Sequence, residues 1–161
     1  MIRSCLLVLI LGFGSVGLFG QSAPELANFI IQEIRASETE GFEVKEAKFD
    51  SGEAVFKLTT AGRGQMVEQS VEFNLADTDV FTQRTLVQTG SEFTCTYALV
   101  AAPRGRAGSI RRNMARVQGT VLLVGATPNG TRVRSLELAF GRLTEVVTGR
   151  QRPVPRIPDL P

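Results

Sequence analysis

The chain contains no histidine and no tryptophan, and only two cysteines among its 161 residues. The absence of histidine removes the commonest general base and the commonest metal ligand. The chain also has no HExxH, CxxC, GxSxG or phosphate-binding-loop pattern, so familiar catalytic motifs give no support for an enzyme. We therefore expect a protein that is not an enzyme, with no catalytic residue, no metal and no cofactor. A hydrolase that draws an Asp/Glu pair from distant residues is the enzymatic alternative.

The first 20 residues have the features of a secretory signal peptide. Arg3 gives a positive start, Cys5 to Phe19 is an apolar run, and the small Gly20 can precede a cleavage site. A cut after Gly17 is an alternative. The apolar run is shorter than the roughly 20 residues that a transmembrane helix needs, so we expect no membrane span in the mature chain. An uncleaved anchor is the other possibility, and the predicted location is periplasmic or extracellular.

Removal of residues 1–20 leaves Cys95 as a single cysteine, which cannot form an internal disulfide. Strand alternation places Cys95 on one face with Phe93, Tyr97 and Leu99. We expect a buried thiol that acts as a small hydrophobe.

Two segments have the periodicity of amphipathic helices. In Ser22 to Ser37, Pro24 and Glu25 suit a first helical turn. The apolar face of this helix is predicted to contain Leu26, Phe29, Ile30 and Ile34. The second segment runs from Asn129 to Gly149, and its apolar stripe consists of Val133, Leu136, Phe140, Leu143 and Val147.

The second helix competes with a hairpin interpretation. Asn129-Gly130 between apolar runs is a hairpin signal, and the residues from Leu136 to Phe140 could alternate in a return strand. The strand pattern stops at Phe140, whereas the helical stripe continues to Val147. The longer periodicity favours the helix.

The residues between these helices have strand-like patterns. The predicted strands are Phe42–Phe49, Ala54–Thr60, Val67–Leu75, Thr85–Gln88, Glu92–Ala101 and Gln118–Gly125. The sequence thus predicts a single α+β domain over residues 21–149, with an N-terminal helix, an antiparallel sheet of about six strands, and a C-terminal helix packed on the sheet. Residues 150–161 contain four prolines and are expected to form a disordered tail.

Asp77 and Asp79 suggest either a turn or the start of a calcium loop. The glycine and the distal glutamate of an EF-hand loop are absent, so we predict a turn. The segment from Phe73 to Val80, followed by the Cys95 strand and the helix from Leu136 to Val147, resembles small exported bacterial proteins of unknown function. The arrangement also resembles the pleckstrin-homology-like fold. This resemblance implies a fold and carries no catalytic residues.

Charge is distributed unevenly along the chain. Residues 21–92 contain thirteen acidic and six basic side chains, whereas residues 93–161 contain eleven arginines and three acidic side chains. Five arginines lie in one segment without acidic residues, and we predict that they bind anions: Arg104, Arg106, Arg111, Arg112 and Arg116. The guanidinium fork suits phosphate and carboxylate groups, and a mobile loop carrying five of them would attract a polyanion. The alternative is that these arginines are solvated or pair with the acidic first half of the chain.

The sequence therefore suggests a non-enzymatic binding or structural module of the cell envelope. One hypothesis is a protein-interaction module that uses a sheet edge or groove. The other is a binder of anionic lipid head groups or another polyanion through Arg104–Arg116. Nucleic acid is not expected, because no aromatic residue is interleaved with these arginines for base stacking.

Overall fold

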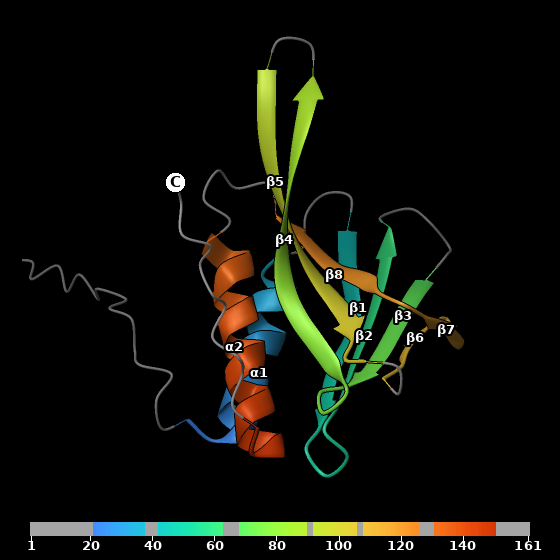
Figure 1. Ribbon diagram of the computed structural model, residues 1–161, viewed down its shortest axis with the longest axis vertical. Coiled ribbons are helices and arrows are strands. Elements are labelled where there is room, and N and C mark those ends of the chain that lie inside the picture. The colour runs from blue at the N-terminus through green and yellow to red at the C-terminus, as the bar shows by residue number, and fades with distance from the viewer. Residues whose placement is uncertain are drawn as a thin grey trace, which may run out of the picture.

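The computed structural model describes residues 21–37, 42–62, 68–89, 92–105, 108–125 and 131–150. The predicted signal peptide, Arg106, Asn129 and residues 151–161 of the predicted tail lie outside the described residues. The two helices are α1 (Ala23–Arg35) and α2 (Thr131–Thr148). The strands are β1 (Phe42–Asp50), β2 (Val55–Gly62), β3 (Glu68–Asn74), β4 (Thr78–Thr89), β5 (Glu92–Pro103), β6 (Ile110–Arg112), β7 (Ala115–Val117) and β8 (Thr120–Gly125). The predicted α+β class and both predicted helices are confirmed (Figure 1).

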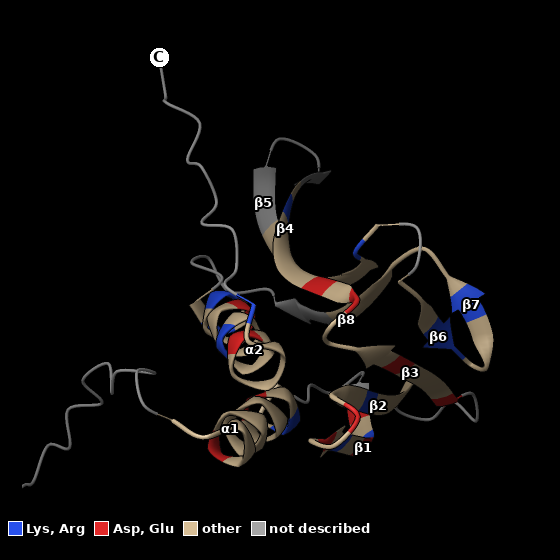
Figure 2. Cartoon of the chain, turned by 60° about the horizontal axis from the view of Figure 1, so that its bottom comes forward, with Lys and Arg blue, Asp and Glu red and all other residues tan. Residues whose placement is uncertain are grey.

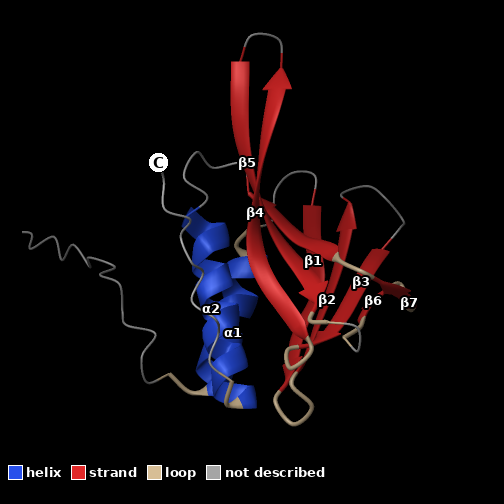
Figure 3. Cartoon of the chain, viewed as in Figure 1, coloured by secondary structure: helices blue, strands red, loops and turns tan. Residues whose placement is uncertain are grey.

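The strands form two antiparallel sheets, so the prediction of one sheet of about six strands is wrong. The larger sheet has the order β1-β2-β3-β6-β7, and the smaller has the order β4-β5-β8 (Figure 3). The chain leaves the larger sheet after β3, at a turn from Leu75 to Asp77. It returns to that sheet only with β6 and β7, which are three residues each and have no alternating apolar pattern to reveal them.

The β4–β5 hairpin is longer than its sequence pattern predicts. The two strands pair without interruption from Thr78 opposite Pro103 to Thr89 opposite Glu92, whereas the pattern predicted a short strand at Thr85–Gln88. The pattern failed because the middle of β4, from Thr82 to Thr85, is polar and largely exposed. In Figure 1 this hairpin extends well beyond the rest of the molecule. Cys95 lies on β5 as predicted, but the burial of its side chain is outside what the structure describes.

Short-range side-chain hydrogen bonds form two of the tight turns. Asp50 Oδ1 accepts a hydrogen bond from the Gly52 backbone N–H at 2.8 Å, which confirms the turn predicted between β1 and β2. Asn74 Oδ1 accepts one from the Ala76 N–H at 2.7 Å in the turn between β3 and β4. The second turn was predicted, but Asn74 forms it rather than the aspartates that follow.

The first turn of α1 is stabilised by Glu25. Its Oε2 accepts hydrogen bonds from the backbone N–H of Ser22 at 2.7 Å and from the Ser22 hydroxyl at 2.8 Å. The buried face of α1 consists of Leu26, Ala27, Ile30 and Ile34. Phe29, which was assigned to this face, is exposed, because it lies at the edge of the apolar stripe.

The pH dependence of stability tests the Glu25 contact. The backbone N–H and then the hydroxyl of Ser22 hold the pKa of the Glu25 carboxyl below its usual value of 4.5. A lowered pKa in the folded state means that this stabilisation is present above about pH 4.5 and is lost as the pH falls through the folded-state pKa. We expect Glu25→Gln to unfold more easily than the wild type at neutral pH. Thermal unfolding over a pH series should show the difference shrinking in acid, and a difference that does not change with pH would contradict the assignment.

The core joins both sheets to α2. Phe140 of α2 is fully buried, and its ring centroid lies 5.0 Å from that of Phe56 on β2 and 6.2 Å from that of Phe73 on β3. The same helix packs beside α1 and against β4, β5 and β8. Its buried residues are Val133, Leu136, Ala139, Phe140 and Leu143. The helix predicted for this segment is thus confirmed, and the alternative hairpin is wrong. The helix contacts strands of both sheets.

Helix α2 ends as its sequence predicts. Gly149 has a φ of +66°, and its N–H donates to the Glu145 carbonyl oxygen at 2.8 Å. This left-handed residue closes the helix and redirects the chain at Arg150. Neither α1 nor α2 combines the length and apolarity that a helix needs to cross a membrane.

Candidate anion-binding surface and pocket

The second half of the arginine-rich segment is an ordered β-hairpin rather than a loop. We call β6 and β7 with their connection, Ile110–Val117, the basic hairpin. Its two-residue turn consists of Asn113 and Met114, which have φ values of +49° and +67°, as expected for the turns that match strand twist. The Asn113 N–H donates to the Ser70 carbonyl oxygen at 2.8 Å, and the Ser70 N–H donates to Asn113 Oδ1 at 2.7 Å. These two bonds attach the turn to β3.

Strand register places charged residues in one row across the five-stranded sheet. Consecutive partners along the row are Lys48, Lys57, Glu72, Arg111 and Arg116, one from each strand. Directly paired residues project from the same face. Strands lie about 4.8 Å apart, so the row spans roughly 19 Å. Figure 2 shows the basic colour of β6 and β7 at the end of the sheet remote from the helices.

Carboxylates neutralise part of this row. Glu46 lies 2.5 Å from Lys48 and 3.5 Å from Lys57, and the hydrogen bond from Lys48 is the main reason that the pKa of the Glu46 carboxyl lies below its usual value. Glu72 lies 3.9 Å from Arg111. All these groups are partly exposed, and such pairs contribute little to stability and are open to competition from another anion.

The structure separates the predicted anion-binding arginines. Arg111 and Arg116 are paired across β6 and β7, and Arg116 Nη2 also donates to the Gly108 carbonyl oxygen at 3.3 Å. Arg112 is paired with Val71 and is exposed on the opposite face of the ribbon. Arg104 lies apart from them, beside Asp79. The predicted alternative, pairing with the acidic first half, is realised for Arg104 with Asp79 and for Arg111 with Glu72.

Arg104 belongs to a pocket between β4 and α2 that sequence reasoning missed. The pocket is a small recess that is open to solvent, with enclosed space for about one water-sized group. Its lining residues are Thr78, Asp79, Val80, Arg104, Phe140, Gly141, Thr144 and Arg150. No sequence pattern links these residues.

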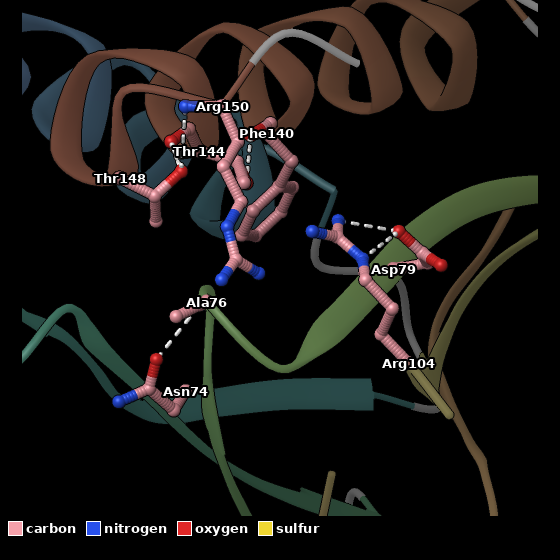
Figure 4. Close-up of polar contacts among 8 residues, drawn as sticks. All are labelled: Asn74, Ala76, Asp79, Arg104, Phe140, Thr144, Thr148 and Arg150. Carbon is pink, nitrogen blue, oxygen red and sulfur yellow. Dashed lines mark hydrogen bonds and ion pairs between the residues drawn. The ribbon is translucent and has the colours of Figure 1, made fainter. Parts of the chain in front are cut away.

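Arg104 and Asp79 form an ion pair in this pocket (Figure 4), whereas Thr78 has no hydrogen-bond partner among the described residues. Arg104 donates from Nε and Nη2 to Asp79 Oδ1, at 3.0 and 2.6 Å. Thr78 is 1% exposed, and its Oγ1 has no hydrogen-bond partner among the residues that the structure describes. Asp79 is the single carboxylate among the described residues of the lining. In the described ranges, no group of three or more His, Cys, Asp or Glu side chains is placed to hold a metal ion.

Comparison of the chain with protein-family models, with curated proteins and with solved structures found no match. The resemblance to pleckstrin-homology-like and small exported proteins therefore stays a prediction.

Proposed function

We propose that the chain is an exported, non-enzymatic binding module of the cell envelope, and that the basic hairpin binds anionic lipid head groups. The observation that carries this proposal is the composition of the hairpin surface. Three exposed arginines occur within eight residues that contain no acidic side chain. Met114, at the tip between them, is 88% exposed.

This combination matches the chemistry of a membrane surface. Arginine forks bind phosphate oxygens in pairs of hydrogen bonds, and each basic side chain near an anionic leaflet contributes about 1 kcal/mol of attraction. An exposed apolar tip gains free energy when it leaves water for the boundary between head groups and acyl chains. Arg111, Arg112 and Arg116 flank the tip on both faces of the ribbon, so the hairpin can engage several head groups at once.

Sedimentation with vesicles tests the proposal. We expect the wild-type protein to bind vesicles that contain phosphatidylglycerol and to leave neutral vesicles unbound, with affinity falling steeply as salt rises. Arg111→Ala/Arg112→Ala should weaken binding about 30-fold, because two contributions of about 1 kcal/mol each are lost.

The matched control removes two cations from elsewhere. Arg35→Ala/Arg134→Ala changes the net charge by the same amount but leaves the hairpin intact. This variant should bind nearly as well as the wild type. The proposal is wrong if both double variants lose affinity equally, or if binding survives Arg111→Ala/Arg112→Ala unaltered.

A second candidate, a protein-interaction module, is favoured by an apolar row on the smaller sheet. Val100 on β5 is paired with Phe81 on β4 and with Val121 on β8. Phe81 and Val121 are 36% and 49% exposed. A partner held by this row would stay bound at high salt, which distinguishes it from a head-group ligand.

A further inference from the structure

We infer that the pocket between β4 and α2 binds a small oxyanion, a carboxylate or phosphate group, between Arg104, Arg150 and Thr78. This site goes beyond the proposed function, because none of its lining residues belongs to the basic hairpin. It would accept a group of a few atoms, whereas the hairpin offers an extended surface.

Arg104 is the preorganised part of the pocket. Its backbone N–H donates to the Asp77 carbonyl oxygen at 2.6 Å, and its Nε and Nη2 are held by Asp79. Both the backbone and the guanidinium group of Arg104 are therefore fixed. The remaining amino group of the guanidinium, Nη1, has no partner among the described residues and can donate to a ligand.

Arg150 supplies the uncompensated charge. Asp79 balances the charge of Arg104, but the Arg150 guanidinium has no ion pair within the described part of the chain. The left-handed Gly149 turns the chain at the end of α2, and in Figure 4 the Arg150 side chain points from the helix toward the turn that contains Ala76. The described residues of the lining thus carry a net charge of one positive unit, which suits a monoanion.

Thr78 provides an independent indication of a ligand. A buried hydroxyl without a hydrogen-bond partner is costly and calls for an explanation. Binding that shifts a neighbouring side chain would let an oxyanion accept this hydrogen bond, because the Thr78 hydroxyl has almost no exposed surface as the structure stands. Phe140 and Val80 form the apolar part of the lining, and Gly141 leaves space because it has no side chain. The recess can take the charged group of a carboxylate or phosphate ligand, with the rest of the ligand at its open mouth.

Titration of the purified protein, followed by amide NMR at constant ionic strength, tests the inference. Propionate and inorganic phosphate are titrated separately, and the anion with the lower dissociation constant identifies the preferred class of ligand. We expect saturable shifts at Thr78, Gly141 and Thr144. Arg150→Gln should weaken binding at least about tenfold, since it removes a charge-assisted hydrogen bond.

Three variants keep the result interpretable. Arg35→Gln removes a surface cation outside the pocket and should leave affinity unchanged. Thr78→Val should weaken binding while leaving the free protein at least as stable as the wild type, because it deletes the unpartnered hydroxyl with little change in shape. Gly141→Ala adds a methyl group to the lining and should also weaken binding. Alanine favours a helix more than glycine does, so this change should not destabilise α2 through helix propensity.

Two outcomes would overturn the inference. One is an absence of saturable shifts in the pocket with either anion, and the other is an equal loss of affinity in Arg150→Gln and Arg35→Gln. Vesicle binding serves as a separate readout. Arg150→Gln should leave it intact, so failure of the pocket and failure of the basic hairpin can be told apart.

Discussion

Replacement of Phe140 by alanine is expected to lower the free energy of unfolding by about 3–5 kcal/mol. The Phe140 ring is fully buried, and it meets the Phe56 ring edge-on, with an interplanar angle of 73°. Its removal would leave a cavity where α2 meets the five-stranded sheet, and aromatic contacts with two strands would be lost together. Chemical denaturation followed by circular dichroism measures the change.

Leu138 is the matched control on the same helix. It is 61% exposed, so Leu138→Ala should change the free energy of unfolding by less than about 0.5 kcal/mol. Similar losses at both positions would mean that α2 does not bury the face assigned to it.

Gly108→Ala is expected to destabilise the protein by about 2–3 kcal/mol. Gly108 is buried, and a Cβ there would lie 2.3 Å from the Asp77 carbonyl oxygen and 3.0 Å from the Arg104 backbone nitrogen. That carbonyl accepts the Arg104 N–H. The segment between β5 and β6 would have to move, and the hydrogen bond that positions Arg104 would be disturbed.

Gly119 is the corresponding control for Gly108. A Cβ at Gly119 would make only an ordinary contact, 3.5 Å from the Ala101 carbonyl oxygen, so Gly119→Ala should be close to neutral in a thermal unfolding assay. If Gly108→Ala is also neutral, then Gly108 does not lie as close to the Asp77 carbonyl oxygen as the structure places it.

Local periodicity was sufficient to predict the elements that bury a continuous face. The stripe from Val133 to Leu143 is buried, and the alternation around Val71 and Phe73 marks β3 correctly. The strand predicted at Phe42–Phe49 is also confirmed as β1, although its register against β2 shifts at a bulge between Val44 and Glu46.

The division into two sheets was not predictable from local pattern. It depends on which strands pair, and β6 pairs with β3 across 35 intervening residues in the register Phe73 to Ile110. Long-range pairing of this kind leaves little trace in a three-residue strand. The polar stretch of β4 was missed for a related reason, because a strand exposed on one side and extending from the body lacks an apolar period.

The sequence predicted part of the candidate anion-binding surface but none of the pocket. Charge asymmetry identified Arg111, Arg112 and Arg116 from the sequence, but only strand register shows that Arg111 and Arg116 share a face with Lys57. The pocket brings together Thr78, Arg104 and Arg150, which lie far apart in the chain. The packing of α2 on β4 creates it, and no local motif encodes that packing.

In the proposed function, the tip of the basic hairpin contacts an anionic membrane surface. The chain contains no tryptophan, so Met114→Trp places a single fluorescent reporter at that tip. On addition of vesicles with phosphatidylglycerol, the account predicts a blue-shifted and stronger tryptophan emission, reversed by salt and absent with neutral vesicles. If the variant sediments with anionic vesicles while its emission remains that of a fully hydrated indole, another surface makes the contact and the account is contradicted.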